Sequence, residues 1–174
     1  MMLKTVGLIM QTDPWPHIIT DDFLSERLLN KAHDLCWEAI PNIDQRLKVR
    51  ITDEDDLYKY CYHRSLEHYY KFNDTRKHTG FAMTLSGIDH NRSNIGIAHT
   101  DKATKLMTTS IYLWPFESKG TMLGKTEDNL DHTIPWKVNR ALSFCRKENV
   151  TWHGFESPQG PRITLNLHLQ YEPI

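Results

Sequence analysis

An α+β fold, in which two helices cover one sheet of a β-sandwich or jelly roll, is predicted by three features of this 174-residue sequence. Two amphipathic helical patterns lie within the first 78 residues. About seven short strand patterns follow from Gly80 onward, and the last of them alternates strictly between polar and apolar residues. We therefore expect one domain over residues 1–174, with a helical support region at 1–78 and a jelly-roll core at 79–174.

Composition excludes several classes of protein. Apolar residues make up 39% and charged residues 25% of the chain, which is typical of a globular domain. The net charge of −1 gives no general attraction to nucleic acid or to an anionic membrane, so we expect neither partner. The three cysteines are far apart, and residues 1–11 have no convincing signal-peptide form. These features predict a soluble cytoplasmic protein with reduced thiols.

The first helical pattern follows a short strand pattern. Residues 14–20 suit an entry strand, and Asp21, Asp22 and Ser25 supply candidate caps for the helix. Apolar residues at helical spacing then extend toward Pro41, which cannot continue a helix. This stripe consists of Leu28, Ala32, Leu35, Cys36 and Ala39.

Residues 46–51 alternate basic with apolar side chains, which predicts a half-exposed strand. Its basic row, Arg46, Lys48 and Arg50, is explained better by a solvated strand face than by an acidic or nucleic-acid partner. A second helix is predicted from Asp55 to Phe72. One side of this helix carries Tyr58, Tyr62, Leu66 and Tyr69.

Strand patterns predominate after residue 80. In the first of them, Phe81, Met83 and Leu85 alternate with smaller residues. Further strands are predicted at residues 94–98, 106–114, 121–123, 140–144, 150–152 and 162–171. Residues 117–139 are mostly polar and contain two glycines and Pro135, so we expect a long mobile loop there that could serve as a lid.

The last strand pattern has two differently used faces. Ile163, Leu165, Leu167 and Leu169 form the apolar face, which we expect to be buried. The opposite face carries Arg162, Thr164, Asn166 and His168. A polar face on a strand of the core indicates a wet cavity inside the β-fold. A guanidinium in such a cavity favours an anionic small molecule as ligand.

A candidate metal site is formed by His99, Asp101 and His153. His99 and Asp101 are the only His-x-Asp in the chain, although ten histidines make one such triplet unremarkable. Their position carries more weight, because they lie between two strand patterns and His153 lies at the end of another. Side chains at i and i+2 of an extended segment point the same way. Two imidazoles and a carboxylate on one face of an ion form the 2-His-1-carboxylate arrangement of non-haem Fe(II) oxygenases.

Taken together, His99-x-Asp101, then His153, then Arg162-x-Thr164 resemble the Fe(II)/2-oxoglutarate-dependent oxygenases, in particular the short prolyl-hydroxylase-like members. The resemblance covers the chain from residue 88 onward, and residues 17–25 resemble the segment before the first helix in that family. It implies a double-stranded β-helix, or jelly roll, with the N-terminal helices packed on one sheet.

The resemblance also implies roles for these residues. His99, Asp101 and His153 would bind iron and form the catalytic centre, and Arg162, assisted by Thr164, would bind the distal carboxylate of 2-oxoglutarate. Tyr112, in the segment Ser110-Ile-Tyr-Leu113, resembles a tyrosine that reaches the same carboxylate. The segment at 120–123 resembles the family's Gly-Gly-x-Thr strand imperfectly, because Lys119 replaces one glycine.

The implied activity is hydroxylation of an unactivated C–H bond with Fe(II), 2-oxoglutarate and O2, and with ascorbate as an optional reductant. Its substrate would be a prolyl or other peptidyl side chain, or a free small molecule. Asp101 favours hydroxylation or demethylation, since halogenating relatives lack this carboxylate. The branch that acts on alkylated nucleic-acid bases has a second arginine on the final strand, and no arginine follows Arg162 here.

The same residues also permit simpler interpretations. The three candidate ligands could be a surface carboxylate and two ordinary histidines, and Arg162 could form a surface salt bridge. Tyr112 could be a plain core aromatic residue. A non-enzymatic jelly-roll binding or structural module with a vestigial metal site is the alternative function.

Overall fold

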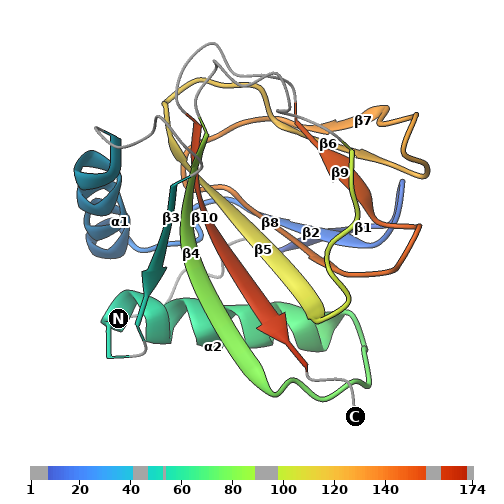
Figure 1. Cartoon of the computed structure of the whole chain (residues 1–174), viewed down its shortest axis with the longest axis horizontal. Coiled ribbons are helices and arrows are strands. Elements are labelled where there is room, and N and C mark those ends of the chain that lie inside the picture. The colour runs from blue at the N-terminus through green and yellow to red at the C-terminus, as the bar shows by residue number, and fades with distance from the viewer. Residues whose placement is uncertain (1–7, 41–46, 53, 89–97, 156–161, 172–174) are drawn as a thin grey trace.

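A computed structural model of the chain describes residues 8–40, 47–52, 54–88, 98–155 and 162–171. Two β-sheets and two helices form this part of the chain (Figure 1). The predicted strand at 94–98 lies outside the described residues except for its last position. Pro41 also lies outside them. Neither described helix is long and apolar enough to cross a membrane.

The large sheet has the strand order β1-β2-β8-β5-β10-β4-β3, and all of its neighbouring strands are antiparallel. In this sheet, strands from the first 78 residues pair with strands of the C-terminal part, as β2 with β8 and β3 with β4. The members are β1 (Ile9–Gln11), β2 (His17–Thr20), β3 (Leu47–Ile51), β4 (Gly80–Ile88), β5 (Lys105–Trp114), β8 (Ala141–Cys145) and β10 (Arg162–Gln170).

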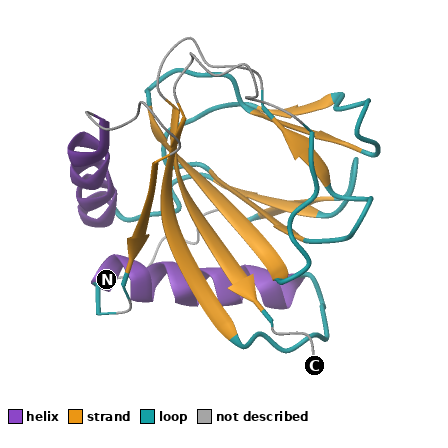
Figure 2. Cartoon of the chain, in the orientation of Figure 1, coloured by secondary structure: helices purple, strands orange, loops and turns teal. Residues whose placement is uncertain are grey.

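The small sheet contains β6 (Thr121–Gly124), β7 (His132–Ile134) and β9 (Trp152–Gly154), in the order β7-β6-β9. It lies at the upper right of Figure 1, apart from β4 and β10 of the large sheet. The two sheets and the flanking helices in Figure 2 form the predicted α+β jelly roll. The fold class predicted from the sequence is therefore confirmed.

Strand β10 lies between β5 and β4 in the large sheet, and its alternation determines what each face does. Its four apolar residues are at most 1% exposed, so they form the core beneath the helices as predicted. The opposite face lines a cleft. Polar positions of the three adjacent strands meet in register there: Thr164 with Ser86, Asn166 with Thr84 and Ser110, and His168 with Thr108.

Helix α1 (Glu26–Ala39) packs on β4 and β5 of the large sheet. Four residues of its predicted stripe are buried, while Leu35 is only half-buried. Ser25 is the N-cap residue but makes no side-chain cap hydrogen bond. Asp21, a candidate cap, pairs instead with Arg140 and Lys137, so it joins the start of the helix to the residues before β8.

Helix α2 (Asp56–Lys71) packs on β10. The Asp55 side chain caps it by accepting a hydrogen bond from the Leu57 amide. The predicted aromatic side is only half-buried apart from Tyr69. The most buried stripe lies one position away and consists of Leu57, Cys61, Ser65, His68 and Tyr69. This stripe includes the polar residues Ser65 and His68. Because they interrupt its apolar pattern, the sequence pointed to the neighbouring face, which carries the tyrosines.

Residues 117–139 were predicted to form a long loop apart from a short strand at 121–123. The strand is confirmed as β6, whereas the loop prediction is wrong at residues 132–134, which form β7. The segment contains the β6–β7 hairpin of the small sheet. Gly120 is required at its start, because a Cβ there would lie 1.8 Å from the Ile134 carbonyl oxygen. The segment ends at Asn139, whose buried side-chain amide exchanges hydrogen bonds with the backbone of Leu24. Strand β7 is too short and polar to produce a strand pattern in the sequence.

A pH dependence of stability follows from His68. Its Nδ1 lies 2.8 Å from Ser143 Oγ on β8, and its ring packs edge-on against Phe23. Burial, helped by the nearby Arg64 cation, lowers the pKa of His68 to about 4. An unfolded histidine takes up its proton near pH 6.5, so this contribution to stability is full above that pH and is lost as the pH falls toward 4.

We expect His68→Gln, which retains a group able to bond Ser143, to lose less stability than the wild-type chain between about pH 7 and about pH 5. Urea unfolding of both proteins at the two pH values measures the difference. An identical loss in the two proteins would show that folding does not exclude a proton from His68.

Candidate metal centre

The three predicted metal ligands converge. His99 and His153 exchange backbone hydrogen bonds of 3.0 Å in an isolated β-bridge, which sets their rings 4.4 Å apart. Asp101 follows two positions after His99, on the same side of the extended segment. One ligand atom from each of the three side chains lies within 4.8 Å of the others. His153 lies inside β9 rather than at a strand end, because β9 begins two residues later than predicted.

Asp101 is held ionised by its neighbours. It is 6% exposed, and burial by itself opposes its charge. The Lys105 ammonium lies 2.5 Å from Oδ1, and the Thr108 hydroxyl donates a 2.6 Å hydrogen bond to Oδ2. Together with His153, these groups outweigh burial and hold the pKa of Asp101 well below its usual range. The carboxylate is therefore available to a cation at any physiological pH.

His153 is prepared as a neutral ligand. Its Nδ1 lies 3.0 Å from the Thr151 carbonyl oxygen, to which only a protonated nitrogen can donate. The other nitrogen, Nε2, then carries the lone pair that a metal needs. Burial lowers the pKa of His153 to about 4 in spite of the nearby Asp101 carboxylate, so the ring is uncharged at neutral pH.

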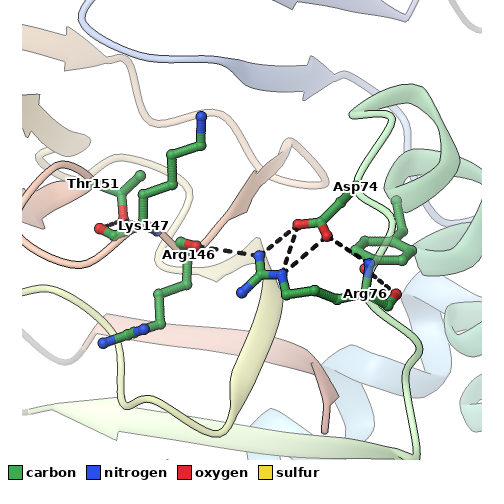
Figure 3. Close-up of polar contacts among 6 residues, drawn as sticks. Asp74, Arg76, Arg146, Lys147 and Thr151 are labelled. Carbon is green, nitrogen blue, oxygen red and sulfur yellow. Dashed lines mark hydrogen bonds and ion pairs between the residues drawn. The ribbon is translucent and has the colours of Figure 1, made fainter.

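The connection from β8 to β9 supports two of the three ligands. Arg146 Nε donates a 2.6 Å hydrogen bond to the Asp101 carbonyl oxygen, and the Thr151 carbonyl oxygen accepts from His153. Figure 3 shows how this connection is itself fixed. Arg76, paired with Asp74, donates to the Arg146 carbonyl oxygen, and the Thr151 hydroxyl bonds the backbone of Lys147. The segment after α2 thus stabilises the connection that positions Asp101 and His153.

The three ligands open into a cleft of about 580 Å³. The polar face of β10 forms part of its floor, as the alternation in the sequence predicted. A cleft of this volume is in the usual range for small-molecule sites. Most of its lining side chains in the described residues carry a hydrogen-bonding group, which agrees with the predicted wet cavity.

Arg162 is a buried cation that faces this cleft. It is 6% exposed, and no carboxylate pairs with it among the described residues. Its guanidinium carbon lies 4.3 Å from the Phe155 ring, 5.0 Å from the Trp136 ring and 5.7 Å from the Tyr112 ring. Burial lowers the pKa of Arg162 to about 10, so the group remains charged at neutral pH.

The hydrogen-bonding capacity of Arg162 is largely unused. Nη2 donates a long 3.3 Å bond to Thr121 Oγ1, and the buried Nε has no partner within the described part of the chain. A desolvated guanidinium with unused donors is costly unless an anion completes it. The interpretation of Arg162 as half of a surface ion pair fails, and an anion site is the arrangement that the geometry favours.

Thr164 and Tyr112 occupy different positions relative to the cleft. Thr164 is 5% exposed and lines it two residues after Arg162. Tyr112 is fully buried beneath the lining, where its ring stacks on Trp136 at 4.5 Å. Its hydroxyl donates a 2.7 Å hydrogen bond to Thr121 Oγ1. Tyr112 therefore does not line the cleft itself but contacts two lining residues, Thr121 through its hydroxyl and Arg162 through its ring.

Sequence reasoning assigned no functional role to Thr121, Trp136 or Phe155. Thr121 lines the cleft and bonds both Arg162 and Tyr112. Its one signal in the sequence is the preceding Gly120, which allows β6 to approach β7 closely. The two aromatic residues lie in loops without any pattern, and they became neighbours of Arg162 only when the two sheets packed together.

We expect Mn²⁺, as a stand-in for a redox-active divalent ion, to bind at the three ligands and stabilise the fold. At a free concentration about a hundred times the Kd, the gain in unfolding free energy should be about 2.7 kcal/mol. His99→Ala should remove most of this gain with little other effect, because His99 is exposed. His63→Ala, at an exposed helix position, is the matched control. Equal gains in both variants would place the ion elsewhere.

No family model matches the sequence, and no curated protein is similar to it. Solved structures do share its fold. A viral collagen prolyl hydroxylase from Paramecium Bursaria Chlorella virus-1, determined as a 2OG complex, is 13% identical with a TM-score of 0.64, covering 93% of this chain and 99% of that one. A Pseudomonas putida prolyl-4-hydroxylase is 14% identical with a TM-score of 0.64, covering 97% and 95%.

A third structure is a prolyl hydroxylase from Trichoplax adhaerens in complex with a peptide fragment of the oxygen degradation domain of hypoxia inducible factor. It is 15% identical with a TM-score of 0.64, covering 88% of this chain and 83% of that chain. The alignments extend over nearly the whole domain in each protein, so the likeness includes both sheets and the helices. The chain thus has the jelly-roll fold of prolyl hydroxylases.

Proposed function

We propose that this chain is an Fe(II)- and 2-oxoglutarate-dependent dioxygenase that hydroxylates an unactivated C–H bond. One observation carries the proposal. A buried, desolvated guanidinium, whose Nε has no partner among the described residues, shares a cleft with two histidines and a carboxylate whose ligand atoms are within 4.8 Å of one another. The fold shared with prolyl hydroxylases supports it.

The donor set fits iron. His99, Asp101 and His153 would occupy one face of the ion and leave the opposite positions for cosubstrate and oxygen. When bound, iron, 2-oxoglutarate and O2 supply the oxidising chemistry, with ascorbate as an optional reductant. The chain holds Asp101 ionised and His153 neutral, so these two ligands need no change of protonation to bind the ion.

The cation fits the cosubstrate. Arg162 and the hydroxyls of Thr121 and Thr164 would bind the distal carboxylate, and Nε, which has no acceptor among the described residues, would gain one. Tyr112 would orient the Thr121 hydroxyl from below through its 2.7 Å hydrogen bond. The aromatic rings around Arg162 exclude water, which strengthens a charge-assisted bond there.

The candidate substrates are of two kinds. The prolyl hydroxylases that share the fold make a prolyl or other peptidyl side chain one candidate, and a free small molecule is the other. We also propose a cytoplasmic location for the chain. All three cysteines are buried and unpaired, which agrees with a reducing compartment.

Turnover without substrate tests the activity. Protein purified without oxygen, loaded with Fe(II) and 2-oxoglutarate and then exposed to O2, should form succinate slowly, as enzymes of this chemistry do when uncoupled. The same protein with His99→Ala should form none. Protein that binds no divalent metal and forms no succinate would instead support a binding module with a vestigial site.

We expect Arg162→Ala to weaken 2-oxoglutarate binding by about ten- to a hundredfold, because one charge-assisted pair contributes about 1.5–3 kcal/mol. Titration of 2-oxoglutarate into the Mn²⁺-loaded protein without oxygen measures this loss directly. Arg27→Ala, which removes an exposed arginine from α1, is the matched control. An unchanged affinity in the Arg162 variant would remove this residue from the cosubstrate site.

A further inference from the structure

The metal ligands lie toward the end of the cleft opposite Arg162. Asp101 bonds Thr108, and Thr108 pairs in register with His168 on β10. Arg162 lies six positions earlier on the same face of that strand, roughly 20 Å away along the backbone. We call the end of the cleft around His168 the far end. This far end is lined by Ala82, Lys102, Thr104, Lys105, His168 and Gln170.

The lining of the cleft has an excess of positive charge. Apart from histidines, its charged side chains in the described residues are Arg162, Lys102, Lys105 and Asp101, which amount to three cations and one carboxylate. A divalent metal and a dicarboxylate cosubstrate cancel each other. The loaded cleft would then retain two positive charges, and the two lysines stand at the far end.

The far end is also unsuited to a hydrocarbon ring. Ala82 is the one apolar side chain among its described lining residues, and the others present ammonium, hydroxyl, imidazole or amide groups. A prolyl ring placed against them would desolvate these groups without offering hydrogen bonds in return. A ligand with anionic oxygens could accept hydrogen bonds from the two ammonium groups.

Lys105 links this end to the metal cluster. Its ammonium lies 2.5 Å from Asp101 Oδ1, and its side chain is 21% exposed. A metal ion bound to the Asp101 carboxylate would repel the Lys105 ammonium. It would also neutralise the negative charge that attracts this ammonium. Lys105 would then be available to a second anion in the cleft. Binding of the metal would therefore strengthen binding of an anion at the far end.

We propose that the primary substrate is a small molecule bearing a carboxylate or phosphate group, which Lys102 and Lys105 bind at the end of the cleft opposite Arg162. This inference rests on the proposed function, because it takes metal and 2-oxoglutarate to occupy the other half. It replaces the prolyl side chain with an anionic small molecule as the substrate.

Inorganic phosphate is the probe for this site. It is titrated into protein loaded with Mn²⁺ and saturating 2-oxoglutarate without oxygen, so that Arg162 is already occupied. Wild-type protein should bind phosphate, and Lys102→Met and Lys105→Met should each weaken that binding about tenfold or more. Lys125→Met is the matched control, because Lys125 is exposed and pairs only with the exposed Asp13 among the described residues.

A second titration tests the coupling. Metal-free Arg162→Ala protein, in which phosphate cannot bind at the cosubstrate end, should bind phosphate more weakly than loaded wild-type protein, since Asp101 then retains Lys105. Equal phosphate affinity with and without metal, or equal affinity in the Lys102 and Lys125 variants, would overturn the inference.

Substrate trials give an independent readout. Anionic small molecules, as free carboxylic acids and phosphate esters, should stimulate 2-oxoglutarate consumption more than a neutral proline-rich peptide does. Stimulation by the peptide alone would overturn the inference and leave the oxygenase activity intact. Failure of Mn²⁺ and 2-oxoglutarate to bind at all would show in the first titration and would remove the proposed function and this inference together.

Discussion

The period of two along β10 is the constraint on which the rest of the structure depends. Successive side chains of a strand point to opposite faces, so its leucines and Ile163 enter the core while its polar residues line the cleft. Its position between β4 and β5 multiplies this effect, because both neighbours present matching polar residues in register. A slip of one residue would bury the Arg162 face in the core and expose the leucines to water.

Buried charge is handled in two opposite ways within this cleft. Asp101 is fully compensated, since a lysine, a hydroxyl and a neighbouring imidazole stabilise its ionised form. Arg162 is surrounded by aromatic rings and one threonine hydroxyl, and its Nε is left unpartnered among the described residues. A compensated carboxylate persists without a ligand, whereas an uncompensated guanidinium gains most when an anion arrives. This asymmetry supports our proposal that Asp101 binds a resident ion and Arg162 a cosubstrate.

Hydrogen bonds from elements remote in sequence hold the candidate metal ligands in place. The β8–β9 connection holds Asp101 through Arg146 and His153 through Thr151, and Arg76 after α2 holds that connection in turn. These contacts bring together residues from three separate parts of the chain. Asp101 lies outside the strands and His153 lies in a strand of three residues, so both would otherwise be free to move, and metal geometry tolerates little movement.

The sequence by itself determined the faces of β10, the three side chains able to ligate a metal and the presence of a cation beside them, because alternation and residue chemistry are local properties. It misplaced the buried face of α2, where Ser65 and His68 interrupt the apolar pattern, and it predicted β6 but not its partner β7. Only the tertiary structure brought Thr121, Trp136 and Phe155 to Arg162. Those contacts depend on how the two sheets pack, which no local pattern encodes.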